Sequence, residues 1–341
     1  MQEHFITEVT DTAKKLRELQ TEHTFSFSVI TDSHIDPLNP KFVARQTHAY
    51  ENMQEVHRQV SIDAIFHLGD ITWCCERPEV RDQWDTPTTE KWLNWTKEQL
   101  CKANENTFFV AGNHDAEWAL EPEPETYYKR MVEFQKDRIT GLVENKPYYY
   151  VDFPEKKVRC ICLMSSFREN GQCYYGYYPE QVKWLAEDAL LAPNGWGIFL
   201  FTHIQPGYVS KYNCPKDNGP EFSRFLRAFA NKERNDCPLF PADFTDVGTA
   251  KLIAMFVGHE HCDWIKEPGE LPCHVIETGC NLTHVPRHGF GWGLPSGCTV
   301  QRRAYNAVEE DLWDTVVYDP EKQTLELIRF GAGGDRHISL D

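Results

Sequence analysis

The sequence predicts an α/β fold, and two observations lead to this expectation. Short apolar, β-prone stretches alternate with segments of helical periodicity over the first 110 residues. Several of these stretches end in a cluster of polar side chains, as strands do when a parallel sheet carries a ligand site at its carboxyl edge. Parallel strands need crossover connections, and the intervening helices would supply them and cover the sheet.

The individual elements follow from residue periodicity. Predicted helices show apolar residues at three- to four-residue spacing, over residues 5–20, 41–60, 87–103, 125–138, 179–191 and 220–233. Predicted strands are short and apolar, over residues 24–30, 64–68, 106–110, 148–153, 158–163, 197–201, 251–257, 274–278, 314–318 and 324–329. Turn-forming residues 154–157 and 319–322 join two pairs of strands into hairpins. The glycine-rich residues 330–336 are expected to form an irregular tail.

The chain is expected to form one domain. Its 341 residues show no repeat, low-complexity segment or linker. We therefore predict a single domain over residues 1–341, with the core in residues 24–280 and a C-terminal loop and closing hairpin in residues 281–341.

Composition indicates which kinds of binding partner are not expected, namely nucleic acid and membrane. A net charge of −17 argues against an extended nucleic-acid surface, which would need a basic face. No stretch has the 18 apolar residues of a membrane span, and charged residues interrupt the first 20 positions, so no signal peptide is expected. The 12 cysteines are interpreted mostly as reduced thiols of a cytoplasmic protein. The oligomeric state is left open.

Five predicted strand ends carry side chains that bind metals. They are Asp32-Ser33-His34, Gly69-Asp70, Gly112-Asn113-His114-Asp115, Thr202-His203 and Gly258-His259-Glu260-His261. This mixture of oxygen and nitrogen donors suits Mn, Fe, Zn or Co, and the lack of cysteine disfavours a structural zinc site. The donors suffice for two metals, which can clamp both oxygens of a phosphoryl displacement and supply a bridging hydroxide near neutral pH.

Each residue taken alone also has a structural interpretation. An isolated histidine is more often structural than a ligand, and an aspartate after glycine, such as Asp70, can cap a helix. The agreement of five clusters favours metal binding. His48, His57 and His67 lie outside the clusters and are interpreted as structural or exposed.

In order, the clusters resemble the calcineurin-like metallophosphoesterase superfamily: Asp-x-His, Gly-Asp, Gly-Asn-His-Asp, a single His and Gly-His-x-His, spanning residues 32–261. The resemblance implies a four-layer αββα sandwich of two mixed sheets flanked by helices. It implies two divalent metal ions (Mn, Fe or Zn), the first bound by Asp32, His34 and His261, the second by Asn113, His203 and His259, and Asp70 bridging them. It also implies that His114 acts near the leaving oxygen, as general acid or transition-state stabiliser, with Asp115 orienting it.

One position departs from a branch of the family. Members often have Gly-Asp-x-x-Asp in the second block, and purple acid phosphatases have a tyrosine that binds ferric iron. Here Trp73 stands at that position, and tryptophan cannot ligate a metal. The iron–tyrosinate chemistry of purple acid phosphatases is therefore not expected.

The expected function is hydrolysis of phosphomonoester or phosphodiester bonds of a small phosphorylated substrate, with a metal-bridging hydroxide as nucleophile. Two alternatives are a nucleotide pyrophosphatase acting on phosphoanhydrides and a catalytically inactive scaffold of the same fold; a scaffold would normally show eroded ligands and lack His114. Residues 205–218 and 279–304 could rim the site. Within the latter, Arg287 and His288 are candidates for substrate contact, although a plain surface loop is an equal alternative.

Overall fold

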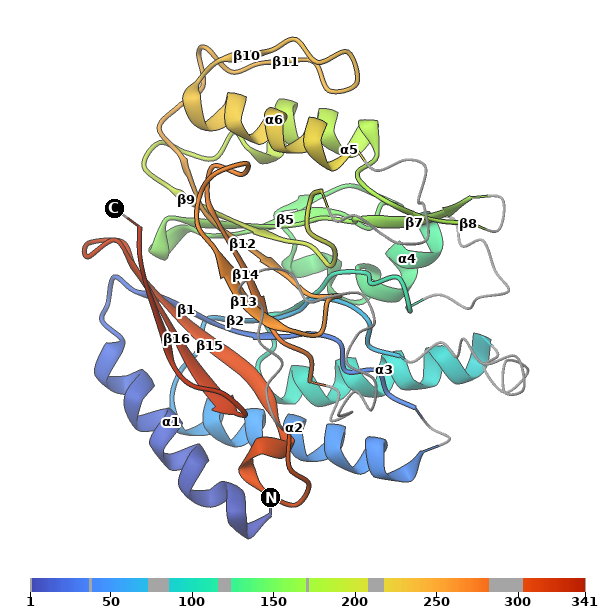
Figure 1. Ribbon diagram of the computed structural model, residues 1–341, viewed down its shortest axis with the longest axis vertical. Helices are drawn as coiled ribbons and strands as arrows, with labels where there is room; N and C mark the ends of the chain where they lie inside the picture. The colour runs from blue at the N-terminus through green and yellow to red at the C-terminus, as the bar shows by residue number, and fades with distance from the viewer. Residues whose placement is uncertain are drawn as a thin grey trace. The chain divides into compact units, whose positions relative to one another are not determined.

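The computed structural model (Figure 1) describes residues 2–36, 39–72, 86–115, 124–169, 172–207, 218–281 and 303–340. The chain divides into two compact units. The first consists of Met1–Phe109, Gly258–Trp264 and Thr278–Asp341, and the second of Val110–Val257 and Ile265–Glu277. This division does not test the prediction of a single domain over residues 1–341, which stays a prediction.

The first unit holds a mixed sheet with the strand order β17-β16-β15-β1-β2-β3. Its strands are β1 (Phe25–Ile30), β2 (Ala64–His67), β3 (Thr107–Phe109), β15 (Leu312–Asp319), β16 (Thr324–Gly331) and β17 (Arg336–Ser339). Strands β1, β2 and β3 run parallel, whereas β15, β16 and β17 pair antiparallel and join the sheet beside β1. Every residue of β1 is buried, so this strand lies in the core of the unit.

Two helices, α2 (Pro40–Gln59) and α3 (Thr86–Ala103), supply the crossovers from β1 to β2 and from β2 to β3. The other described helices of this unit are η1 (Glu3–Phe5) and α1 (Ile6–Leu19), which precede β1, and η6 (Val308–Glu310), which precedes β15. Pro40 suits the first turn of α2, where no intrahelical N–H is needed, and the Asn39 side chain accepts from Lys41 N–H at 3.3 Å. Helix α1 contacts β15 and β16, and α2 contacts both α1 and α3 (Figure 1).

The second unit contributes most of another mixed sheet, with the order β13-β14-β12-β9-β6-β5-β4. Its strands are β4 (Gly141–Leu142), β5 (Tyr149–Phe153), β6 (Val158–Cys162), β9 (Gly197–Phe201), β12 (Lys251–Val257), β13 (Asp263–Lys266) and β14 (His274–Thr278). Strands β6, β9, β12 and β14 are parallel, and β5 pairs antiparallel with β4 and β6. The predicted fold class, α/β with two mixed sheets flanked by helices, is confirmed.

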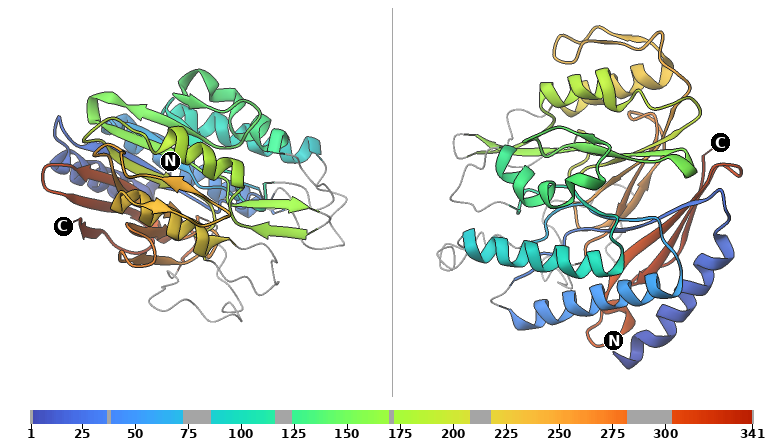
Figure 2. Two further views of the ribbon diagram at one scale, coloured as in Figure 1. Left: turned by 90° about the horizontal axis from the view of Figure 1, so that it is seen from above. Right: turned by 180° about the vertical axis from the view of Figure 1, so that it is seen from behind.

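The remaining elements of the second unit are helices and two small ribbons (Figure 2). The helices are α4 (Pro124–Met131), η3 (Glu133–Arg138), η4 (Pro154–Lys156), α5 (Pro179–Trp184), η5 (Leu185–Ala189) and α6 (Gly219–Asn231). The ribbons pair β7 (Ser166–Glu169) with β8 (Gln172–Tyr175), and β10 (Arg234–Asn235) with β11 (Ala242–Asp243).

Two predicted helices change type along their length. Residues 125–138 form α4 followed by the 3₁₀ helix η3, and residues 179–191 form α5 followed by the π-helix η5. The prediction of an irregular tail over residues 330–336 is wrong at both ends, because Phe330 and Gly331 belong to β16 and Arg336 begins the edge strand β17. Short edge strands carry too few residues to show a period-2 pattern, and pairing with β16 decides their conformation.

The described cysteines mostly fit the thiol interpretation. Cys160 and Cys162 are fully buried in β6, and Cys101, Cys237, Cys273 and Cys280 are also free, whereas Cys262 is disulfide-bonded. Among the described residues, no helix is both long and apolar enough to cross a membrane.

Candidate metal centre

The loops after β1 and β2 lie side by side because their pairing continues past the strand ends. Beyond Ile30↔His67, the N–H of Asp32 donates to Gly69 O at 3.1 Å, and the N–H of His34 donates to Asp70 O at 2.9 Å. A third bond joins Ile35 N–H to the carbonyl of Ile71 at 2.8 Å. This parallel pairing brings two of the predicted ligand blocks together at the carboxyl edge of the sheet.

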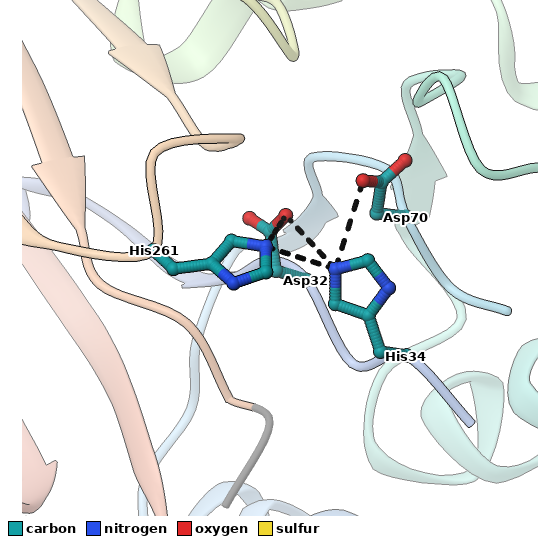
Figure 3. Close-up of side chains that lie close together, drawn as sticks. All are labelled: Asp32, His34, Asp70 and His261. Carbon is teal, nitrogen blue, oxygen red and sulfur yellow. Dashed lines mark hydrogen bonds and ion pairs between the residues drawn. The ribbon is translucent and has the colours of Figure 1, made fainter. Parts of the chain in front are cut away.

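Four predicted ligands of the first unit converge (Figure 3). They are Asp32, His34, Asp70 and His261. His34 Nε2 lies 2.9 Å from His261 Nε2, 3.5 Å from Asp32 Oδ1 and 3.7 Å from Asp70 Oδ2. His261 Nε2 lies 3.0 Å from Asp32 Oδ1.

This spacing fits a bound divalent cation. A metal about 2.1 Å from each of two adjacent ligands places the ligand atoms about 3.0 Å apart at right angles and about 3.4 Å apart in a tetrahedral site. Asp32 and His34 are fully buried and Asp70 is 1% exposed, so two carboxylates share a site from which water is largely excluded. Burying like charges this closely is costly without a cation, which supports metal binding as the role of the cluster.

The carboxylate of Asp32 is held in place from one side. Its Oδ2 accepts from Thr31 Oγ1 at 2.7 Å and from His259 N–H at 3.0 Å, which leaves Oδ1 directed at the two histidines. A Cβ on Gly258 would lie 2.1 Å from Thr31 Oγ1 and 2.6 Å from Asp32 Oδ2. Glycine is therefore required at position 258, the first residue of the Gly258-His259-Glu260-His261 block, since only a hydrogen atom fits beside this carboxylate.

The ligand residues of the first unit also share an uncommon backbone conformation. Positive φ angles occur at Asp32 (52°), His34 (43°), Asp70 (51°), His259 (78°) and His261 (56°). Such values are unfavourable for side chains with a Cβ and cluster at functional sites, where surrounding structure enforces them. Half of the ten described non-glycine residues with positive φ are predicted metal ligands.

Electrostatics at His261 reflect its acidic surroundings. Burial disfavours the charged imidazole, but interactions with the neighbouring Cys280 and with the carboxylate of Asp32 outweigh burial and raise the pKa of His261 well above its usual value. The Cys280 Sγ also lies 3.5 Å from the carbonyl of Asp32. The negative charge of the Asp32 carboxylate beside this imidazole favours a bound cation.

In the second unit, the predicted ligands Asn113 and His203 lie together. His203 Nε2 is 3.1 Å from Asn113 Oδ1; His203 is fully buried and Asn113 is 8% exposed. The segment around His203 is positioned by two bonds, from Thr202 N–H to Phe256 O and from Ile204 N–H to Ser165 Oγ. An amide oxygen and an imidazole nitrogen at this distance are suitable ligands for one cation.

The segment that carries His114 is a tight turn. Asp115 is fully buried, and its Oδ2 accepts from Gly112 N–H at 2.8 Å, while its carbonyl accepts from Arg130 Nη1 at 3.1 Å. Asp115 therefore shapes the backbone around His114. Whether it also orients the imidazole, as the resemblance implies, stays a prediction.

Several predicted positions lie outside the described residues. They are Trp73, Arg287, His288, residues 208–217 and residues 282–302. Sequence reasoning also overlooked three contributors to the site, namely Thr31, Gly258 as a space requirement and Cys280. Thr31 and Gly258 adjoin ligand blocks in the sequence, which is the signal that could have pointed to them, whereas Cys280 lies far from every block and no local signal indicates it.

Comparison with known proteins agrees with the arrangement of the blocks. The model of the family described as calcineurin-like phosphoesterase matches residues 25–263, about 70% of the chain. Among curated proteins, no match was found.

Solved structures with distant similarity were also found. One is GAP50, the anchor in the inner membrane complex of Plasmodium, with 11% identity and a TM-score of 0.45, covering 93% of this chain and 89% of that one. Chaetomium thermophilum Vps29 has 12% identity and a TM-score of 0.33, covering 92% and 97%. The phosphopantetheinyl hydrolase PptH from Mycobacterium tuberculosis has 13% identity and a TM-score of 0.33, covering 76% and 91%. Likenesses this distant say nothing about the activity of this chain.

Proposed function

Because the chain belongs to the calcineurin-like phosphoesterase family, we propose that it is an active phosphoric ester hydrolase that uses two divalent metal ions. The observation that carries this proposal is the convergence of Asp32, His34, Asp70 and His261 in the first unit. A scaffold that had lost catalysis would have no need to keep two buried carboxylates and two imidazoles in this strained arrangement.

The two sets of ligands have distinct proposed roles. Asp32, His34 and His261 hold the first metal, Asn113, His203 and His259 hold the second, and Asp70 contributes to both. Bound divalent cations in such a site polarise phosphoryl oxygens and lower the pKa of water, which is the chemistry that ester hydrolysis needs. Mn, Fe and Zn all accept this mixture of oxygen and nitrogen ligands.

His114 is the proposed catalytic side chain near the leaving oxygen. His114 follows the ligand Asn113 but has no ligand role in the proposal. Its imidazole donates a proton to the departing alkoxide, or stabilises charge on the phosphoryl oxygens, while the buried Asp115 holds the turn.

The substrate is proposed to be a small phosphorylated molecule, with Arg287 and His288 contacting it. The ligands do not discriminate monoesters from diesters, and a nucleotide anhydride remains the second candidate substrate. A panel of phosphomonoester, phosphodiester and nucleotide substrates assayed with Mn²⁺ would separate these classes. The cytoplasmic location of the protein is likewise part of the proposal.

The metal centre is tested by Asp70→Asn. An amide cannot contribute the negative charge that a shared ligand needs, so the variant should hold fewer than two metals per chain and lose hydrolysis. Elemental analysis of metal-loaded protein measures the first effect and the substrate panel the second. The matched control is Asp63→Asn, because Asp63 immediately precedes β2, whereas Asp70 follows it, and Asp63 accepts from Ser26 N–H at 2.7 Å. Two metals and normal turnover in Asp70→Asn would remove Asp70 from the centre.

A further inference from the structure

A buried histidine outside the five blocks joins two of the ligand loops. His67 is the last residue of β2 and is fully buried. Its Nδ1 lies 3.2 Å from the backbone nitrogen of Gly69, and its Nε2 lies 2.8 Å from Ser33 Oγ. Gly69 precedes the ligand Asp70, and Ser33 stands between the ligands Asp32 and His34.

The hydrogen bonds determine which ring nitrogen carries the proton. A backbone N–H can only donate, so Nδ1 of His67 accepts from Gly69 and carries no proton. The single proton of the neutral ring is then on Nε2, which donates to Ser33 Oγ. Ser33 Oγ also accepts from the Tyr50 hydroxyl at 3.1 Å, so α2 is connected to the same bridge.

We propose that His67 is a positioning residue for the metal centre, because its imidazole locks the Gly69-Asp70 loop to the Asp32-Ser33-His34 loop. The effect of His67 on metal binding rests on the proposed function, in which these loops hold metal ions. The ligands Asp32, His34 and Asp70 all have positive φ, so contacts beyond the ligands must enforce their backbone conformation. Removing a group that does not touch the metal but fixes the position of its ligands typically lowers metal affinity 10- to 100-fold.

The ring is also fixed in orientation by packing. His67 stacks on Phe109 of β3, with ring centroids 5.9 Å apart and planes inclined by 18°. A phenylalanine at position 67 can keep this stacking but makes neither hydrogen bond. His67→Phe therefore separates the bridge from the packing.

A second histidine of the same unit provides the matched control. His57 Nε2 lies 2.9 Å from the hydroxyl of Ser28 in β1, and burial lowers the pKa of His57 to about 3, so this ring too is neutral. Neither His57 nor Ser28 adjoins a ligand loop. His57→Phe should therefore also lower the free energy of unfolding, but it should leave the metal centre unchanged.

The experiment measures Mn²⁺ affinity of wild type, His67→Phe and His57→Phe by competition with a chelator. We expect a 10- to 100-fold larger dissociation constant for His67→Phe and less than a twofold change for His57→Phe. Wild-type affinity in folded His67→Phe, or an equal loss in both variants, would overturn the proposal.

The second measurement needs no metal and no variant. In metal-free wild-type protein with ¹⁵N-labelled histidine, ring nitrogen shifts report the tautomer of His67. A proton on Nε2 with an unprotonated Nδ1 supports the bridge, and a proton on Nδ1 would overturn it even if His67→Phe fails to fold. Wild-type protein that binds no Mn²⁺ would contradict the proposed function, while the tautomer would still decide whether the bridge exists.

Discussion

At the residue scale, the ligands of the first unit depend on small and polar neighbours. Asp32 is oriented by Thr31 and by the N–H of His259, and it tolerates only a glycine at position 258. His67 contributes at the same scale, by joining loops that the sheet alone places side by side. Thr31, Gly258 and His67 are not themselves expected to touch a metal.

The proposed proton donor can be separated from metal binding at this scale. His114→Asn keeps a polar side chain but cannot deliver a proton, so metal content should stay intact while kcat on an alkyl ester falls by ~100- to 10,000-fold. The loss should shrink on a p-nitrophenyl ester, because that leaving group barely needs protonation. Elemental analysis and paired kinetics on the two esters provide the measurements.

The pattern of losses identifies the role of the imidazole. An equal loss on both esters would argue against general-acid catalysis and for electrostatic stabilisation of the phosphoryl oxygens. A variant that loses metal would instead show that His114 supports the ligands.

At the scale of elements, the C-terminal strands are tied to the segment that follows His261. Arg329 in β16 donates to Asp314 Oδ1 in β15 at 2.7 Å and pairs with Asp263 Oδ2 at the start of β13 at 3.0 Å. Arg336 in β17 contacts both carboxylates. Burial alone would raise the pKa of Asp314, but the two guanidinium groups lower it. The family match ends at residue 263, so this cluster joins the last matched residue to strands outside the match.

Removing one cation from this cluster should destabilise the fold. Arg329→Met leaves two buried carboxylates opposite the single guanidinium of Arg336, and breaking a buried pair typically costs about 3–5 kcal/mol. Arg336→Met is the matched control; the Arg336 side chain is 17% exposed against 1% for Arg329, so its loss should cost less. Urea denaturation measures both, and equal stability of Arg329→Met and wild type would show that the cluster does not hold these strands.

At the scale of the whole molecule, one buried carboxyl group should shape the pH dependence of folding. Burial raises the pKa of Asp311 to about 7, although a bond from Asn52 Nδ2 to Asp311 Oδ2 at 2.7 Å opposes the increase. The folded protein thus holds a proton that the unfolded chain releases near its ordinary pKa of 3.8. Since the native state binds more protons between these values, stability falls as pH rises from about 4 to about 7.

Asp311→Asn should remove this loss. The amide keeps a carbonyl oxygen for Asn52 and has no charge to bury, so the variant should exceed wild type at pH 8 by roughly 2–4 kcal/mol. The advantage should shrink at pH 5. Urea denaturation in the presence of a chelator, which prevents metal binding from adding its own pH dependence, provides the test. A difference between variant and wild type that does not change with pH would show that Asp311 ionises normally in the folded protein.

Much of this architecture could be predicted because the signals are local. Stretches such as residues 197–201 and 252–257 are continuous apolar runs, and Pro40 and Pro179 stand in the first turns of helices. The ligand blocks could be recognised because polar residues directly follow these strands. The periodicity of apolar residues and the polar residues at strand ends both involve residues that are close together in the chain, so they can be recognised from the sequence alone.

Other features were decided only by tertiary structure. The 2.9 Å approach of His34 to His261 joins residues more than 200 positions apart, and it depends on strand order rather than spacing. The bridging role of His67 depends on the register between β1 and β2, which brings Ser33 to its ring. Arg329 acquires its partners in the same way, from strands paired in space. Sequence by itself determined which side chains stand at strand ends, whereas the pairing of strands distant in the chain determined which of them meet, because that pairing is set by burial of the whole core.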